Sequence, residues 1–215
     1  GMVKSDPVDI VKVVTIFILS ISLPILADDR VDKGERLFNQ NCVFCHQPDA
    51  IGKPGLAPSL TNPELLEISS DKYLMSTIRD GRKDTSMPPY PHLGREGIMS
   101  ILAYLRSHDR RANRVVEVDA QEQAQGDPRL GQLWFDQICA TCHGPQGDGY
   151  LAGGSGTAIG KSGFLSKVSD GFIRETIKVG RSNTRMLPFQ GPAGLADLAD
   201  REIEDIISYM RTLEE

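Results

Sequence analysis

Helical periodicity dominates the order of apolar and polar residues beyond position 27. The spacing i, i+3, i+4, i+7 occurs at Ile98, Ile101, Leu102 and Leu105, and again at Ile203, Ile206, Ile207 and Met210. One apolar stripe on each helix predicts one packed face. No segment alternates apolar and polar residues over a useful length, so the pattern predicts an all-α fold.

The remaining expected elements occur in pairs. Short helices are expected over 32–40 and 128–137, and further helices over 70–79 and 169–179 that stop at Gly81 and Gly180. The segment 48–63 is rich in Pro and Gly and is expected to form a loop. Asp71, Gly81 and Met87 each recur 99 positions later, as Asp170, Gly180 and Met186. This repeat predicts two tandem domains, 28–118 and 119–215, with the boundary in the polar stretch 109–127.

The first 27 residues stand apart from the repeat. Residues 13–27 are almost wholly apolar and follow Lys4 and Lys12. The length of the stretch and the end Ile25-Leu26-Ala27 suit a cleaved signal peptide, whereas Asp6 and Asp9 are unusual in such a leader. A retained N-terminal hydrophobic helix over 10–27, with Lys12 reaching the interface, is the alternative, and we favour that membrane anchor.

The charge of the chain limits the classes of partner that it is expected to bind. The chain has a net charge of −5, all of it in the second half, and it lacks the block of Lys and Arg that nucleic-acid binding would need. An acidic face on that half could steer a basic partner or simply be a solvated surface. The arginines between 106 and 114 are read first as a helix end and linker, and second as a docking patch.

All four cysteines belong to two copies of one pentad, Cys-x-x-Cys-His. The copies are Cys42-Val-Phe-Cys45-His46 and Cys139-Ala-Thr-Cys142-His143. A Cys-x-x-Cys pair can also be half of a zinc site or a redox-active dithiol, but neither explains a His directly after both pairs. The pentad is the attachment signature of a c-type haem, in which two thiols bind one porphyrin and the next residue offers an imidazole to the iron. We therefore expect two covalently attached haem c groups. Haem is attached to such pentads beyond the cytoplasmic membrane, which predicts a periplasmic location under either reading of the N-terminus.

The sixth iron ligand decides between electron transfer and chemistry on a substrate. The candidates in the first half are Met75, Met87, Met99, His92 and His108. Met75 and Met99 lie in expected helices, where Met is more often a core residue. Met87 lies in a loop before Pro88-Pro89, and it matches Met186 before Leu187-Pro188.

These motifs resemble the class I cytochrome c domain, used twice as in diheme cytochromes c of the cytochrome c4 type or the diheme subunit of cbb3-type oxidases. Gly-x3-Phe-x3-Cys-x-x-Cys-His stands at 34–46 and 131–143, and Gly-Arg-x4-Met before Pro-Pro or Leu-Pro stands at 81–89 and 180–188. The resemblance covers nearly everything from Asp32 onward. It implies that His46 with Met87, and His143 with Met186, ligate the two irons. It also implies that Gly34 and Gly131 let the first helix of each domain cross the last beside Tyr104 or Tyr209. Gln47 departs from the pattern, since the second copy has Gly144 there.

The sequence therefore predicts an electron carrier rather than an enzyme. A diheme c-type cytochrome of this kind would pass single electrons between redox protein partners in a periplasmic respiratory or photosynthetic chain. The alternative is a diheme oxidoreductase, of the peroxidase or thiosulfate-oxidising type, with catalysis at one haem. A Met in the same context in both halves argues against the alternative.

Overall fold

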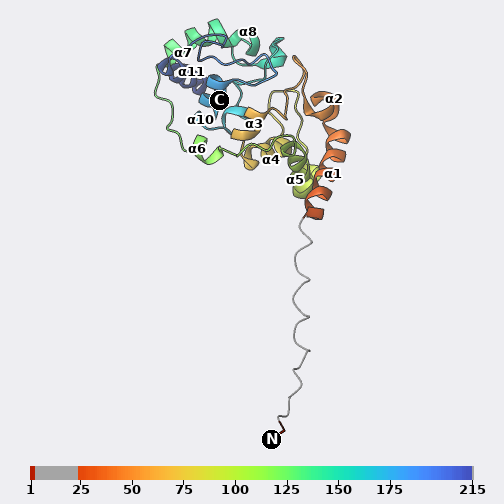
Figure 1. Cartoon of the computed structure of the whole chain (residues 1–215). Coiled ribbons are helices and arrows are strands. Elements are labelled where there is room, and N and C mark those ends of the chain that lie inside the picture. Colours follow the sequence, from red (N-terminus) through yellow and green to blue (C-terminus); the bar gives the residue numbers. More distant parts are fainter. Residues whose placement is uncertain (3–23, 215) are drawn as a thin grey trace.

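The computed structural model describes residues 1, 2 and 24–214. Residues 24–214 form two helical domains joined by a linker (Figure 1). The first domain contains α1 (Pro24–Asn41), α2 (Val43–His46), η1 (Pro48–Ala50), α3 (Pro63–Ile68), α4 (Asp71–Asp80), η2 (Pro91–Leu93) and α5 (Gly94–Arg106). The linker contains α6 (Val115–Asp119). The second domain contains α7 (Pro128–Trp134), the π-turn η3 (Phe135–Cys139), α8 (Ala140–His143), η4 (Gly149–Ala152), α9 (Ser162–Leu165), α10 (Asp170–Val179) and α11 (Asp200–Thr212). Extended structure in the described part of the chain amounts to one isolated bridge between Lys53 and Ala57, so the all-α prediction is confirmed there.

The first and last helices of each domain cross at a glycine. A Cβ added to Gly34 would lie 1.8 Å from the carbonyl oxygen of Ser100, and one added to Gly131 would lie 1.8 Å from that of Asp205. In both domains the Cβ of the expected Tyr, Tyr104 or Tyr209, comes next at 2.9 Å. Backbones this close leave no room for any other residue, which confirms the crossing that the family resemblance implied.

The apolar stripes of α5 and α11 are buried as their periodicity predicts. Ile98, Ile101, Leu102 and Leu105 are between 1% and 5% exposed, and Ile203, Ile206, Ile207 and Met210 between 0% and 2%. Part of the first domain, including Tyr73 and Leu102, belongs to the same core cluster as α10 and α11. The two domains therefore share a continuous hydrophobic core.

Local polar groups set the ends of the helices. Ser70 and Ser169 cap α4 and α10 through bonds to the amides of Tyr73 and Phe172, and both helices stop at a glycine with positive φ. α3 and α9 are additional to the elements predicted from sequence, and Asn62 caps α3 through the amide of Leu65. These short helices matter because they lie at the domain interface.

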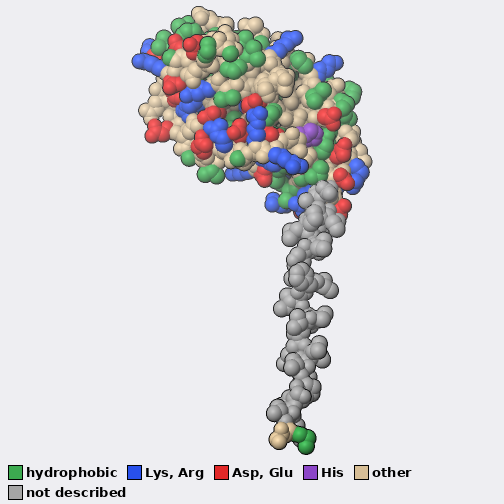
Figure 2. Space-filling model, in the orientation of Figure 1, with side chains coloured by type: hydrophobic (Ala, Val, Ile, Leu, Met, Phe, Trp, Pro, Cys, Tyr) green, Lys and Arg blue, Asp and Glu red, His purple; other side chains and the backbone are tan. Residues whose placement is uncertain are grey.

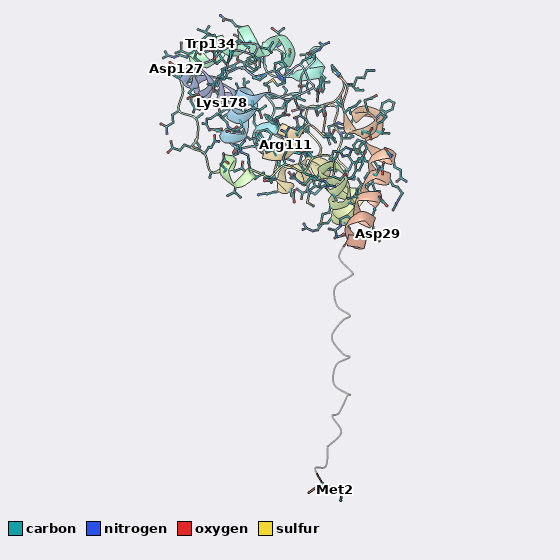
Figure 3. The ribbon with its side chains drawn as sticks, in the orientation of Figure 1. Met2, Asp29, Arg111, Asp127, Trp134 and Lys178 are labelled. Carbon is teal, nitrogen blue, oxygen red and sulfur yellow. The ribbon has the colours of Figure 1, made fainter. Side chains whose placement is uncertain are left out.

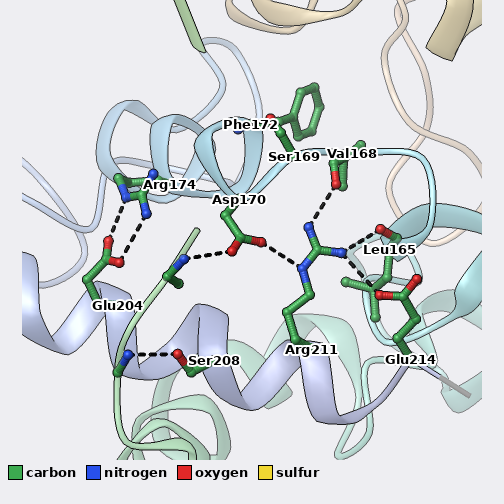
Figure 4. Close-up of polar contacts among 12 residues, drawn as sticks. Leu165, Val168, Ser169, Asp170, Phe172, Arg174, Glu204, Ser208, Arg211 and Glu214 are labelled. Carbon is green, nitrogen blue, oxygen red and sulfur yellow. Dashed lines mark hydrogen bonds and ion pairs between the residues drawn. The ribbon is translucent and has the colours of Figure 1, made fainter. Parts of the chain in front are cut away.

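One arginine clamp recurs in both domains. Arg211 on α11 bonds to Asp170, to the carbonyl of Leu165 and to the carbonyl of Val168, at 2.7, 2.5 and 2.8 Å (Figure 4). Arg106 on α5 makes the equivalent bonds to Asp71, Leu66 and Ser69 at 2.8, 3.0 and 2.7 Å. Each clamp ties the last helix to the turn before the preceding long helix, and so fixes the same domain shape twice.

The linker packs on both domains. The amide of Arg114 bonds to the carbonyl of Glu67 at 2.8 Å, while Val118 is fully buried in the core shared with α10. Arg111, in the middle of the folded part in Figure 3, is 3.7 Å from Glu64, and Arg114 pairs with Glu67, Glu117 and Glu175. Arg111 and Arg114 therefore hold the linker in place, in agreement with the first interpretation of that cluster. The expected boundary near 118 falls inside α6.

The hydrophobic N-terminal helix predicted over 10–27 lies mostly outside the described residues; residues 24–27 form the start of α1. Within the described part, no helix is both long and apolar enough to cross a membrane.

Candidate functional site

In each domain, the pentad lies on a short helical turn that continues the first helix of that domain. The amide of His46 bonds to the carbonyl of Cys42 at 3.0 Å, and α2 ends at His46. In the second domain the π-turn η3 leads into α8, which ends at His143. The turn brings the two thiols and the imidazole of each pentad onto one short segment, as attachment to a single porphyrin requires.

A backbone carbonyl holds each histidine ring. Nδ1 of His46 lies 2.9 Å from the carbonyl oxygen of Pro58, and Nδ1 of His143 lies 2.6 Å from that of Thr157. Since the carbonyl can only accept, Nδ1 carries the proton and the lone pair of Nε2 is available to a metal. Burial lowers the pKa of both imidazoles, against the opposing effect of these bonds, so both rings are neutral near pH 7.

The loop that holds His143 lies directly on its ring. A Cβ added to Gly156 would come within 2.7 Å of Cε1 of His143, and the amide of Gly156 bonds to the carbonyl of Cys142 at 2.8 Å. The ring is therefore fixed on one side by glycine backbone, which suits an axial ligand that must keep one orientation.

The thiols fit haem attachment better than a zinc site. Burial, with a smaller contribution from the neighbouring cysteine, raises the pKa of Cys42 to about 11 and that of Cys139 to about 12. Across the described residues, no three His, Cys, Asp or Glu side chains gather as a metal cluster would need. The residues present therefore fit two c-type haems.

The loop that carries each expected methionine ligand is built in the same way. Each loop begins at a glycine with positive φ. A Cβ added to Gly81 would lie 2.7 Å from the carbonyl oxygen of Met87, and one added to Gly180 would lie 2.5 Å from that of Met186. The amide of Arg82 bonds to that oxygen of Met87 at 3.0 Å, and Arg181 repeats the bond to Met186 at 2.6 Å.

A threonine that the sequence analysis did not identify closes each loop. Thr85 Oγ1 donates to the carbonyl of Arg82 at 2.8 Å and accepts from the amide of Met87 at 3.2 Å. Thr184 makes the same two bonds to Arg181 and Met186, at 2.8 and 3.1 Å. A Thr two positions before Met in both halves was the available signal.

The structure brings the first methionine loop next to its pentad. Tyr90, three residues after Met87, donates from Oη to the carbonyl of Asn41 at 3.1 Å, directly before Cys42. Burial, followed by the nearby thiols of Cys42 and Cys45, raises the pKa of Tyr90. Phe189 is at the equivalent position of the second domain and is 7% exposed.

The other candidates for the sixth ligand lie elsewhere. Met75 packs on the core from α4, and Met99 lies on α5. His108 bonds through Nδ1 to the carbonyl of Tyr104, and its ring meets that of Tyr104 edge to face with centroids 4.8 Å apart. His92 is exposed on η2. Met87 and Met186 are half-buried, and they remain the candidates with matching surroundings.

Comparisons with known proteins identify both domains. Residues 29–105 match the family described as cytochrome c oxidase, cbb3-type, subunit III, and residues 129–214 match the cytochrome c family. The chain is 31% identical to the cbb3-type cytochrome c oxidase subunit CcoP of Rubrivivax gelatinosus, over 84% of this chain and 53% of that protein. It is 25% identical to CcoP of Azospirillum sp. (strain B510), over 84% of this chain and 61% of that protein. The chain thus spans a little over half the length of these relatives.

A solved structure shares the fold of both domains together. It is the Kuenenia stuttgartiensis reducing HAO-like protein complex Kustc0457/Kustc0458, with a TM-score of 0.50, 19% identity, and coverage of 86% of this chain and 96% of that one. The doubled pentad, the two family matches and the repeated architecture agree. The protein is a diheme c-type cytochrome, built from two cytochrome c domains and carrying two covalently attached haem c groups.

Proposed function

We propose that the protein transfers single electrons between redox partners of a periplasmic respiratory or photosynthetic chain, with both irons ligated by histidine and methionine. The ligands are His46 with Met87 and His143 with Met186, and the haems are attached through Cys42, Cys45, Cys139 and Cys142. A haem iron held by imidazole and thioether exchanges one electron and has no open position for substrate.

One observation carries this proposal: the two methionine loops share the same hydrogen bonds. In both, an arginine amide and a threonine hydroxyl fix the backbone on either side of the methionine. The two loops keep Arg, Thr and Met at matching positions and share this arrangement although the residues between them differ, which supports one ligand set for both irons. An oxidoreductase with one open haem would need only one such loop.

The visible and near-infrared spectra of the full-length haem protein test the ligand set. We expect low-spin iron at both haems and a methionine-to-iron charge-transfer band that Met87→Ala and Met186→Ala each reduce by about half, since each haem contributes one thioether bond. Each variant should also lower the midpoint potential of its own haem. High-spin iron at rest in the unaltered protein would favour the peroxidase or thiosulfate-oxidising alternative. Met99→Leu is the matched control, because Met99 lies on a helix outside the loop.

The relatives named CcoP support a membrane-bound respiratory complex as the partner, with residues 10–27 as the anchor. Figure 2 shows acidic and basic side chains interspersed on one face of the described domains, without a large patch of a single sign on that face. Purification from native membranes, followed by N-terminal sequencing, tests both points. A chain that begins at Asp28 and elutes without an oxidase or other redox complex would refute the anchored subunit.

A further inference from the structure

The linker covers one surface of the second domain. Residues 120–127 run without helical structure across α10 and α11, and their amides bond to side chains of both helices. The amide of Ala124 donates to Oδ2 of Asp170 at 2.7 Å, and that of Gly126 donates to the hydroxyl oxygen of Ser208 at 2.9 Å. Figure 4 shows both acceptors, Asp170 and Ser208. The covered side chain of Asp170 is only 9% exposed.

An ion pair under this part of the linker joins the two helices. Arg174 on α10 bonds to Glu204 on α11 at 2.5 and 3.0 Å (Figure 4). The same guanidinium bonds to the side chain of Gln121 at 2.9 Å and to the carbonyl of Glu122 at 3.1 Å. This surface of the domain is therefore shaped to hold a non-helical stretch of polypeptide.

The equivalent surface of the first domain is uncovered. Oδ1 of Asp71 accepts the bond from Arg106 described above, but within the described part of the chain no donor bonds to its Oδ2. The side chain of Asp71 is 67% exposed, against 9% for Asp170. Residues 24–30, which stand at the same distance before the pentad as 121–127, belong to the helix α1 instead. The chain thus supplies a cover for one domain and none for the other.

Two methionines replace the ion pair on the uncovered surface. Met75 on α4 stands at the position of Arg174, and Met99 on α5 stands at that of Glu204. Both methionines are half-buried. Methionine is flexible and polarisable, and it is frequent at surfaces that bind other polypeptides. An occupant of this surface must therefore be apolar where the linker is polar, since a side chain such as Gln121 would find no partner there.

Two cations border the methionines. Lys72 lies three positions before Met75, and Arg95 lies four positions before Met99, so each cation is on the same helix face as its methionine. Both are exposed, and neither forms an ion pair within the described part of the chain. Acidic side chains on an occupant would complement them.

A hollow extends the uncovered surface toward the linker. It has a volume of about 560 Å³, and Asp71, Leu66 and Val116 are part of its lining. Val116 on α6 is 85% exposed. A segment that reaches Asp71 therefore finds further apolar surface beyond it.

We propose that this surface of the first domain binds an extended segment of a partner protein, a subunit of the membrane redox complex proposed above. Apolar side chains of the segment lie against Met75 and Met99. Its acidic side chains meet Lys72 and Arg95, and one of its amides donates to Oδ2 of Asp71. The inference rests on the proposed function and goes beyond it, because it assigns the contact to the first domain and to a segment of stated chemistry.

Site-specific photo-cross-linking in native membranes tests the proposal on the full-length haem protein. We expect Met99→benzoylphenylalanine to capture one short continuous segment of a redox-complex subunit, with both apolar and acidic residues, as identified by mass spectrometry. Glu204→benzoylphenylalanine is the matched control and should react with residues 121–123 of the protein itself. Capture of lipid, of a second copy of this chain or of many unrelated proteins at position 99 would overturn the proposal. So would the lack of any product at position 99 when position 204 reacts.

A double variant separates this contact from electron transfer itself. Met75→Arg with Met99→Glu introduces the ion pair of the second domain, so the two helices remain joined. We expect it to reduce the amount of co-purifying redox complex about tenfold, because the apolar side chains of the partner would then cover charged groups. Haem spectra and midpoint potentials should not change. Met75→Leu with Met99→Leu keeps the surface apolar and should co-purify normally.

The outcomes distinguish this inference from the proposed function. An undiminished yield of redox complex with the double variant would refute the binding surface and leave the proposed function standing. The absence of any redox complex from the unaltered protein would refute both the membrane partner and this inference. If the double variant does not accumulate as haem protein, Lys72→Glu with Arg95→Glu, at exposed positions, provides the same comparison.

Discussion

Tyr73 and Phe172 occupy equivalent positions, 99 residues apart in the sequence, and their rings meet edge to face across the domain interface with centroids 5.5 Å apart. The contacts around them are reciprocal. Asn62 and Glu64 bond to Ser182, while Gly163 lies against the backbone of Arg82 and Lys83. The two domains therefore face each other through the same surface, related by an approximate two-fold rotation.

Phe172 is buried at this contact, since it is 4% exposed and its ring also meets that of Phe164. We expect Phe172→Ala to lower the free energy of unfolding by about 3–5 kcal/mol, and Tyr73→Phe by about 1 kcal/mol through loss of the bond from Arg82. Denaturant unfolding of the haem protein measures both. Equal and small effects would mean that the interface contributes little to stability.

Close helix crossing makes Gly34 and Gly131 sensitive to substitution. Ala at either position places its Cβ 1.8 Å from a backbone carbonyl, so the helices must separate. We expect Gly34→Ala and Gly131→Ala to prevent accumulation of the haem protein. Gly97→Ala is the control, because its Cβ would meet only side chains at 3.4 Å or more. Normal haem content in Gly34→Ala, measured by pyridine haemochrome, would contradict the crossing.

Gln47 stores backbone strain that its counterpart avoids. It has φ 66° and ψ 165°, and Gly144 has φ 84° and ψ 159°. Such a conformation costs a non-glycine residue about 1–3 kcal/mol. Glycine avoids this cost, but it also makes the unfolded chain more flexible, which offsets part of the gain in stability. We expect Gln47→Gly to stabilise the first domain by about 1 kcal/mol in thermal unfolding. Gly144→Gln should have the opposite effect, and a destabilising Gln47→Gly would show that its bond to the carbonyl of Phe44 matters more.

The threonines of the methionine loops should influence iron ligation. Thr85→Val and Thr184→Val keep the side-chain shape but remove the hydroxyl that bridges Arg and Met, so each should weaken the charge-transfer band of its haem and lower its midpoint potential. Thr85→Ser and Thr184→Ser keep the hydroxyl and should resemble the unaltered protein. If Val and Ser variants give the same spectra, the hydroxyl does not position the methionine.

Acid should loosen the domain interface through Glu64. Burial acts to raise the pKa of this carboxyl, but hydrogen bonds from its own amide and from Ser182, together with the charge of Arg111, lower it below the ordinary value of 4.5. A lowered pKa in the folded state contributes stability that is present above pH 4.5 and is lost as the pH falls through the folded value. Thermal midpoints measured from neutral pH downwards should therefore decline more steeply below pH 4.5 for the unaltered protein than for Glu64→Gln. Parallel curves would exclude Glu64 as a source of acid sensitivity.

Sequence reasoning identified the helices with long apolar stripes and the repeat that relates the domains, because α5 and α11 each bury four residues at helical spacing. It did not reveal α3 and α9, since six and four residues are too few for a periodic signal. The sequence indicated that position 47 is unusual, because Gln47 aligns with Gly144, but it did not show the backbone strain there.

The pairing of the domains could not be predicted. It depends on contacts such as that between Asn62 and Ser182, which lie 120 positions apart and leave no local pattern. The threonines escaped notice for a different reason: a hydroxyl that bonds only to the backbone of its own loop looks like any polar loop residue until the loop geometry is known.

When two equivalent surfaces pair with each other, as in a symmetric dimer, the assembly is limited to two members. Because the surface around Tyr73 and that around Phe172 already cover each other, no third domain of this type can be added there, and the pair cannot extend into a chain of stacked domains. A redox partner in the proposed electron transfer would therefore bind on a surface outside this interface.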